Sequence, residues 1–253
     1  MNRLVLSGIA LSLLAGQATA ADMRVKAPPM MPPAPVFSWT GCYLNAGVGY
    51  GLWDQEHNET FLRTGISDVE TTAGGRGWLG RFGGGCDLQL SGTFSSFVIG
   101  AFADYDTMDL TGTISLPFFN DVASEKESSA WTVGGRIGWA VAPQVLTYFD
   151  GGWSETRFDQ MIETTSLGVV NGFGFPSHTY NGWFLGGGVE YNFNWLPIQG
   201  LFLRTEYRYN SYQGDNLAEF AVATAAPSGI ILHSKKEVQT VTTSLVWRFN
   251  FFH

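Results

Sequence analysis

Residues 201–209 read LFLRTEYRY, and this stretch decides the fold of the chain. Leucine, threonine and tyrosine occupy its odd-numbered positions, whereas Arg204, Glu206 and Arg208 lie two residues apart on the even-numbered ones. Side chains two residues apart share a face of a β-strand, so these three charges must point the same way. The stretch therefore predicts a strand with an apolar environment on one face and a polar environment on the other.

The same period-two alternation recurs in seven other segments of the 253-residue chain. The eight segments lie at residues 44–52, 78–88, 97–106, 131–139, 147–153, 183–193, 201–209 and 240–251. The fifth segment is the least regular; we place Tyr148 and Asp150 on its polar face, and the opposite assignment stays open. Eight alternating strands in succession predict an all-β, antiparallel up-and-down barrel.

Such a barrel is either soluble, with its apolar face inward, or embedded in a membrane, with that face outward. Trp and Tyr lie near both ends of the strands, as in barrels whose aromatic rings mark the two headgroup layers. The connections alternate between short ones and four long ones, at residues 54–75, 111–128, 159–180 and 213–236. We therefore predict an eight-stranded transmembrane barrel in the outer membrane, with short periplasmic turns and four long extracellular loops. A soluble, lipocalin-like periplasmic binding protein is the alternative.

Composition and the N-terminal sequence limit the remaining possibilities. A 45% hydrophobic chain with only 14% charged residues is not intrinsically disordered, and a net charge of −8 leaves no broad basic surface for nucleic acid. Arg3, an apolar run and small residues predict a cleaved signal peptide at residues 1–20. The Pro-rich residues 21–40 are expected to be a periplasmic tail, and residues 41–253 the barrel domain.

The polar faces of the predicted strands carry charges of both signs in equal number. They are Arg81, Arg136, Arg204, Arg208 and Arg248, with Asp104, Asp106, Asp150, Glu190 and Glu206. An eight-stranded barrel has room inside for little more than side chains, and buried charges must pair. The ten residues predict a lumen plugged by salt bridges. A small porin-like channel is the alternative, although it would favour an excess of one sign.

The two cysteines have matching positions on the first two predicted strands. In a hairpin centred near Thr64, facing residues have numbers that sum to about 128, as the numbers of Cys42 and Cys86 do. In an oxidising periplasm this arrangement predicts a disulfide.

No constellation for catalysis or metal binding is found in the sequence. His57, His178, His233 and His253 are scattered, with no cysteine or carboxylate at metal-ligand spacing. Nucleophile-elbow, P-loop and dinucleotide motifs are missing as well. We expect no enzymatic activity, no metal and no cofactor.

The four long loops are the expected sites for surface partners, and the loop at residues 54–75 is the most acidic of them. It carries five acidic residues against Arg63, a net charge of −4. The acidic residues are Asp54, Glu56, Glu59, Asp68 and Glu70. One hypothesis is that this loop binds divalent cations or basic partners.

Four segments carry a resemblance to a known family: FSWTGCY at 37–43, GGRIGWA at 134–140, GGGVEY at 186–191 and LRTEYRY at 203–209. With them the chain resembles the alpha-proteobacterial outer-membrane β-barrel proteins of the porin-opacity type, which are related to the OmpA transmembrane domain. The resemblance implies a structural role in a Gram-negative envelope, with surface exposure and no catalytic residues. Outer-membrane lipid and lipopolysaccharide would surround the barrel.

The resemblance also implies that a barrel-assembly machinery reads the last strand, which usually ends on an aromatic residue. Leu245, Trp247, Phe249 and Phe251 are the expected signal, and here Phe252 and His253 follow it.

Overall fold

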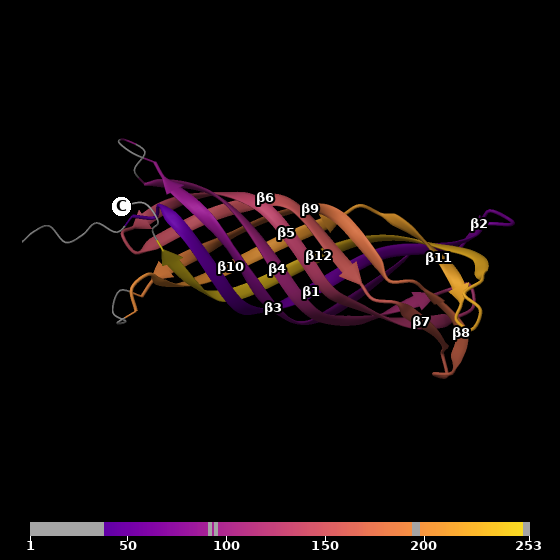
Figure 1. The fold of residues 1–253 in the computed structure, drawn as a ribbon. Coiled ribbons are helices and arrows are strands. Elements are labelled where there is room, and N and C mark those ends of the chain that lie inside the picture. Colours follow the sequence, from indigo (N-terminus) through magenta and orange to yellow (C-terminus); the bar gives the residue numbers. More distant parts are fainter. Residues whose placement is uncertain (1–37, 91–92, 94–95, 194–197, 250–253) are drawn as a thin grey trace, which may run out of the picture. The chain divides into compact units, whose positions relative to one another are not determined.

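The computed structural model describes residues 38–90, 93, 96–193 and 198–249 (Figure 1). These residues belong to one compact unit, which spans Val36–His253. The expected signal peptide, most of the expected tail at 21–40, Phe251 and His253 lie outside the described residues. No helix in the described ranges is long and apolar enough to cross a lipid bilayer.

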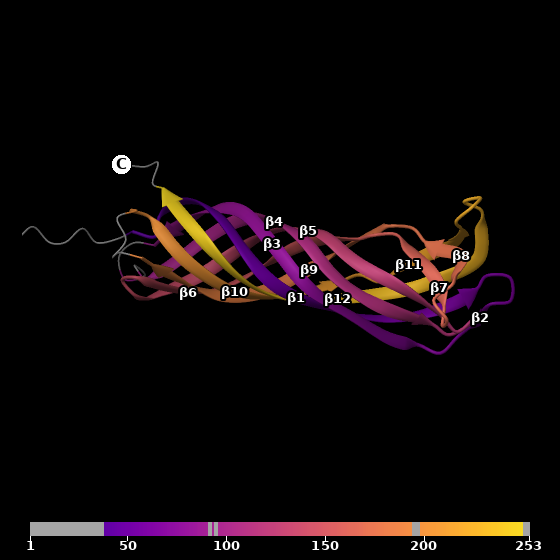
Figure 2. The same cartoon turned by 90° about the horizontal axis from the view of Figure 1, so that it is seen from below.

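Eight long strands of the described chain form a closed ring. They are β1 (Gly41–Phe61), β3 (Thr71–Gln89), β4 (Phe97–Leu116), β5 (Asp121–Ala142), β6 (Val145–Phe158), β9 (His178–Asn192), β10 (Leu201–Tyr212) and β12 (Pro227–Phe249). Each pairs antiparallel with the next, and β12 pairs with β1, so the ring has no free edge. Figures 1 and 2 show these strands tilted around a common axis. The predicted eight-stranded up-and-down barrel is confirmed.

The hairpin of β1 and β3 has the register that its sequence predicts. Cys42 faces Cys86 and Tyr50 faces Trp78, with no bulge between these pairs.

The structure also shows which face of the fifth predicted segment, residues 147–153, points into the barrel, a choice that the sequence left open. Phe149 points outward and is 76% exposed, whereas Tyr148 and Asp150 are buried inside the barrel.

Four shorter strands extend the ring at one end, opposite the end at which β12 terminates (Figure 1). They are β2 (Ile66–Ser67), β7 (Met161–Thr165), β8 (Val170–Phe175) and β11 (Asp215–Ala221). β7 pairs with β5 and with β8, and β11 pairs with β8 and with β12. The outer end of the barrel is therefore walled by β-structure.

The extent of the four expected loops needs correction. Segments 54–75, 111–128, 159–180 and 213–236 do connect the barrel strands at the outer end, but most of their residues are strand. The turns at their tips cover only residues 62–65, 117–120, 166–169 and 222–226.

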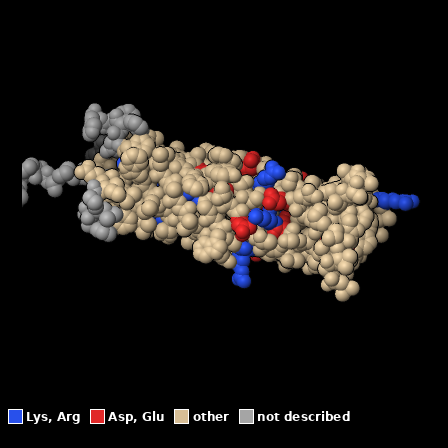
Figure 3. All heavy atoms as spheres, turned by 60° about the horizontal axis from the view of Figure 1, so that its bottom comes forward, with Lys and Arg blue, Asp and Glu red and all other residues tan. Residues whose placement is uncertain are grey.

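The reason is a reversal of the apolar face part-way along the strands. On β4, Ile99 is exposed and Asp104 is buried, but farther out Leu110 is buried and Asp109 is exposed. The outer part of each strand keeps period two with its apolar side chains inward, because it is surrounded by water rather than lipid. Figure 3 shows most of the visible charged side chains in one belt near the middle of the barrel, where the reversal occurs.

Candidate functional site

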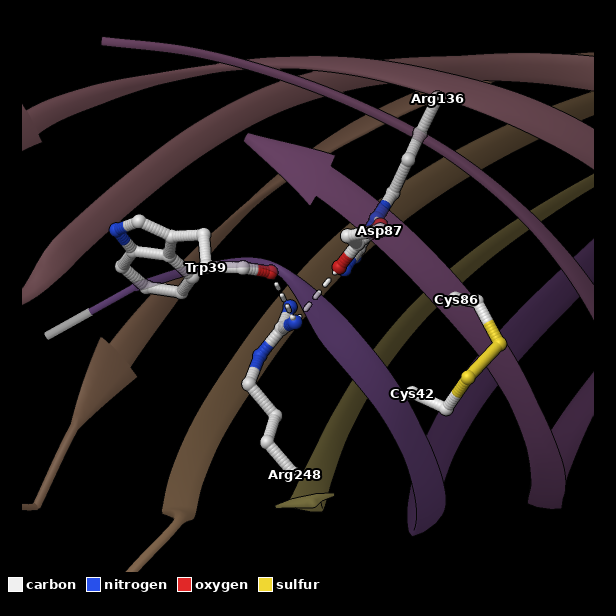
Figure 4. The surroundings of a disulfide bond; sticks show 6 residues. All are labelled: Trp39, Cys42, Cys86, Asp87, Arg136 and Arg248. Carbon is white, nitrogen blue, oxygen red and sulfur yellow. Dashed lines mark hydrogen bonds and ion pairs between the residues drawn. A yellow bond between two sulfur atoms is a disulfide. The ribbon is translucent and has the colours of Figure 1, made fainter. Parts of the chain in front are cut away.

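The lumen contains two groups of ion-paired side chains, and the first lies near the short-turn end. This periplasmic cluster consists of Arg136, Arg204 and Arg248 with Asp87 and Glu190, one residue from each of five strands. Glu190 Oε2 lies 3.0 Å from Arg204 Nη2, and its Oε1 lies 2.6 Å from Arg248 Nε. Asp87 Oδ2 lies 2.7 Å from Arg248 Nη1, and Asp87 also binds Arg136 through two hydrogen bonds. Figure 4 shows Arg136 and Arg248 directed at Asp87 from opposite sides.

The second group, the central cluster, has fewer basic residues than acidic ones. It consists of Arg81 and Arg208 with Asp104, Asp106, Asp150 and Glu206. Arg81 binds Asp106 through Nε and Nη2, each at 2.7 Å, and reaches Glu206 Oε1 at 2.6 Å. Arg208 Nη2 lies 2.6 Å from Asp104 Oδ2, and Arg208 Nε lies 2.5 Å from Glu206 Oε1. The two-point contact between Arg81 and Asp106 is of the bidentate kind, which is among the strongest ion pairs in proteins.

The structure brings all ten charged residues that the sequence placed in the lumen into these two clusters. The eleventh member, Asp87, was not among the predicted lumen charges. Its position six residues from Arg81 places both side chains on the same, polar face of β3, and this was the signal for including it. With Asp87 included, the clusters contain five basic and six acidic side chains.

Tyrosine rings connect the two clusters. The guanidinium carbons of Arg136, Arg204 and Arg248 lie 4.6, 4.5 and 5.0 Å from the centre of the Tyr43 ring. Tyr148 donates a hydrogen bond of 2.6 Å from its hydroxyl to Glu206 Oε2, and its ring lies 5.0 Å from Arg136. The two tyrosine rings thus occupy the space between the charged groups, and cation–π contacts and a hydrogen bond hold them there.

Apolar side chains close the lumen at the periplasmic end. Trp39 is buried there against Phe202, with ring centres 5.3 Å apart, and its backbone carbonyl accepts a hydrogen bond from Arg248 (Figure 4). Val98, Leu146 and Val246 belong to the same buried group. Trp39 falls within the segment expected to be a tail, yet it packs inside the barrel because a large ring gains free energy from burial.

A third layer, beyond the central cluster, surrounds a single buried lysine. Lys236 Nζ lies 2.6 Å from Glu125 Oε1 and between 4.1 and 5.2 Å from the ring centres of Phe158, Trp53 and Tyr180. This site was not predicted, because Lys236 and Glu125 fall in segments expected to be surface loops.

The acidic residues of segment 54–75 are divided between the surface and the interior. Asp54, Glu56 and Glu70 are exposed, whereas Glu59 is buried and its backbone NH donates to Asp68 Oδ1 at 2.7 Å. No group of three or more His, Cys, Asp or Glu residues in the described part of the chain is arranged to hold a metal ion.

The three described histidines lie near the outer end. His57 is buried rather than solvent-facing, and its Nε2 lies 2.8 Å from the carbonyl oxygen of Ser115. His178 Nε2 lies 2.8 Å from Asp215 Oδ2, and His233 Nε2 lies 3.1 Å from Thr60 Oγ1. These contacts of His57 and His178 link strands that do not pair with each other, whereas that of His233 links the paired strands β12 and β1.

The cysteines Cys42 and Cys86 are joined by a disulfide between β1 and β3, with Cα atoms 3.9 Å apart (Figure 4). The bond closes a covalent loop across a sequence separation of 44 residues. A cross-link of this length reduces the entropy of the unfolded chain and thereby stabilises the folded state.

Replacing both cysteines by alanine is expected to lower the free energy of unfolding by about 2–4 kcal/mol. Urea titration of the purified barrel in detergent would measure this. Reductant should lower the midpoint of the wild type and leave that of the double variant unchanged. Equal midpoints for the oxidised wild type and the double variant would show that the disulfide contributes no stability.

Comparison with known proteins assigns the chain to a family. Residues 8–249 match the model of the outer membrane protein beta-barrel domain. The chain belongs to this family. This outer-membrane barrel shares its fold with OprG from Pseudomonas aeruginosa, at a TM-score of 0.55 and 11% identity over 84% of this chain and 98% of OprG. No curated protein matches it.

Two other solved structures align with this outer-membrane barrel at lower scores. Ail, the attachment invasion locus protein of Yersinia pestis, has a TM-score of 0.38 and 11% identity over 83% of this chain and 99% of Ail. The outer membrane protease OmpT from Escherichia coli has a TM-score of 0.41 and 11% identity over 82% of this chain and 97% of OmpT.

Its location in the outer membrane explains the exterior of the barrel. Apolar side chains are exposed along the lipid-facing part, and Trp78, Trp131 and Trp183 form part of an aromatic belt at its outer border. Trp139 and Trp247 lie at the opposite border. A soluble carrier is excluded, because an apolar exterior of this kind requires lipid.

Proposed function

We propose that this protein is a structural outer-membrane barrel of the porin-opacity type, which supports envelope integrity and presents its outer end at the cell surface. The observation that carries the proposal is the filling of the lumen at successive levels. The apolar group around Trp39, the two charge clusters and the layer around Lys236 follow one another along the axis. Pairing of charges from opposite walls ties the barrel together, as a rigid structural element requires.

The chemistry of the lumen supports a closed barrel over a porin-like channel. A conducting pore needs charged side chains that face water and exchange ions with it. Here Arg81, Arg208 and Glu206 face one another, and each is almost completely buried. A catalytic role forms no part of the proposal, since the lumen charges are held by ion pairs within the barrel.

The partners we propose follow from the exterior. Outer-membrane lipid and lipopolysaccharide would contact the apolar face, and the assembly machinery would read the end of β12. Leu245 and Trp247 are exposed on that face and Phe249 is half-buried, whereas Phe251 lies outside the described residues.

Liposome swelling tests whether the lumen conducts. Vesicles that contain the folded protein are expected to swell in arabinose no faster than empty vesicles, because the paired charges and rings leave no continuous water path. A difference in mobility between boiled and unboiled samples on an SDS gel would verify folding before reconstitution. Vesicles with the variant Trp39→Ala should swell no faster than those with the wild type. Both charge clusters lie farther along the axis than Trp39 and still block the lumen when its ring is removed. Sugar flux through the wild type would contradict the proposal and establish a small porin-like channel.

A further inference from the structure

A cavity of about 510 Å³ lies at the outer end of the barrel, within the β-structure that replaces the expected loops. We call it the outer pocket. Carboxylates and aromatic rings line it together: Asp121, Glu163, Glu219, Phe61, Phe119 and Phe173. The three carboxylates come from β5, β7 and β11, so the pocket depends on the pairing of strands that are distant in the sequence.

The carboxylates of the outer pocket are deeply buried. Asp121, Glu163 and Glu219 are 7%, 2% and 3% exposed, and Glu59 on β1 is 1% exposed. Asn171 Nδ2 bridges two of them, at 2.6 Å from Asp121 Oδ2 and 2.8 Å from Glu163 Oε2. No Lys or Arg in the described part of the chain forms an ion pair with any of the four.

Two buried carboxylate oxygen atoms at this site receive no hydrogen bond from an amide, hydroxyl or cationic donor. They are Glu59 Oε2 and Glu163 Oε1, and Glu163 lines the outer pocket beside the Glu219 carboxyl group. An ionised carboxylate that is buried without a donor or a cation costs several kcal/mol. In the two lumen clusters below, guanidinium groups meet this need. The outer pocket instead combines open space with carboxyl groups that no basic side chain neutralises.

Burial sets the protonation of these groups, which lie beyond the outer aromatic belt. It raises the pKa of Glu163 to about 8, and a hydrogen bond with the neighbouring Glu219 carboxyl group raises that pKa further. Burial also raises the pKa of Glu59 to about 7, with Asp68, Glu163 and Asp121 adding to the shift. A bound cation favours the ionised carboxylates, so cation binding must be accompanied by proton release near neutral pH.

The walls of the outer pocket favour an organic cation over a metal ion. The described residues offer no metal-binding arrangement of three or more ligands, and the volume is within the range of small-molecule sites. Aromatic rings attract ammonium groups and also bury apolar carbon. Phe119 and Phe173 are exposed in the absence of a ligand.

We propose that the outer pocket binds a small organic cation, an ammonium group attached to an apolar body. The ammonium group would lie against Glu163 Oε1, the oxygen that Asn171 does not contact, and the apolar body would cover Phe119 and Phe173. Binding at this site is independent of whether the lumen conducts, because the two charge clusters lie deeper in the barrel.

The test is calorimetric titration of the full chain in neutral detergent with benzyltrimethylammonium. The charge of this probe is permanent, so any pH dependence comes from the protein. Its affinity is expected to rise at least tenfold from pH 6 to pH 8.5, as the carboxylates lose their protons. Benzyl alcohol, which is neutral, should show no such rise. Absence of binding at pH 8.5, or an affinity independent of pH, would overturn the proposal.

Variants locate the binding. Glu163→Gln should weaken binding at pH 8.5 at least tenfold and flatten its pH dependence, whereas Glu56→Gln removes the same charge from the exposed face of β1 and should bind as the wild type does. Phe119→Ala, at an exposed position where folding is not at risk, should weaken binding several-fold. Equal affinities for the wild type, Glu163→Gln and Phe119→Ala would place the probe elsewhere and overturn the proposal.

Discussion

Replacing Glu190 by glutamine is expected to lower the free energy of unfolding of the barrel by about 3–5 kcal/mol. Glu190 is fully buried and faces three guanidinium groups, those of Arg136, Arg204 and Arg248. Glutamine keeps the volume and removes the charge. Three buried positive charges then share Asp87 alone, in a region too small to admit enough water to screen them.

Urea titration in detergent, followed by tryptophan fluorescence and by mobility on unboiled gels, would measure this loss. Glu155→Gln is the matched control, because Glu155 lies on the same barrel but outside the lumen, on the outward face of β6. It should change the midpoint little. If Glu190→Gln and Glu155→Gln unfolded at the same urea concentration, the periplasmic cluster would not be a source of stability.

Replacing Lys236 by methionine is expected to lower the free energy of unfolding by about 3 kcal/mol. Methionine has a similar length, so packing against Phe158 and Trp53 is largely retained. The loss comes from Glu125, whose carboxylate remains buried after its cation is removed, and from the cation–π contacts. Lys235→Met, at the adjacent exposed position, is the matched control and should be close to neutral.

The double variant Lys236→Met with Glu125→Gln separates the ion pair from the packing. Replacing both partners of a buried ion pair by neutral groups is often tolerated, so the double variant should recover most of the stability that Lys236→Met loses. A double variant less stable than either single variant would show that each residue acts through other contacts.

The alternation of side chains between the two faces of a strand explains why the lumen charges and the β1–β3 register could be predicted from the sequence. Arg204, Glu206 and Arg208 share a face in any strand, and a strand that separates lipid from a lumen must turn that face inward. The register of β1 and β3 follows from counting about Thr64, which is how Cys42 and Cys86 come to face each other. Neither inference needs knowledge of side-chain packing.

The outer half could not be predicted because its surroundings differ. Outward-facing apolar side chains end where the lipid ends. The buried Ile114 and Lys236, which lie farther out, were therefore assigned to loops. The outer pocket was hidden for a second reason. Asp121, Glu163 and Glu219 are far apart in the sequence, and only the pairing of β7, β8 and β11 brings them together.

The reversal of the apolar face along each strand also determines how deep the barrel sits. Moving it outward along the membrane normal would expose Trp78 and Trp131 to water, and moving it inward would push Asp54 and Lys235 toward hydrocarbon. A basic side chain on the lipid face costs about 2–4 kcal/mol at the bilayer midplane and less near the interface. The barrel therefore has one preferred height, and bilayers of different thickness must adjust to it.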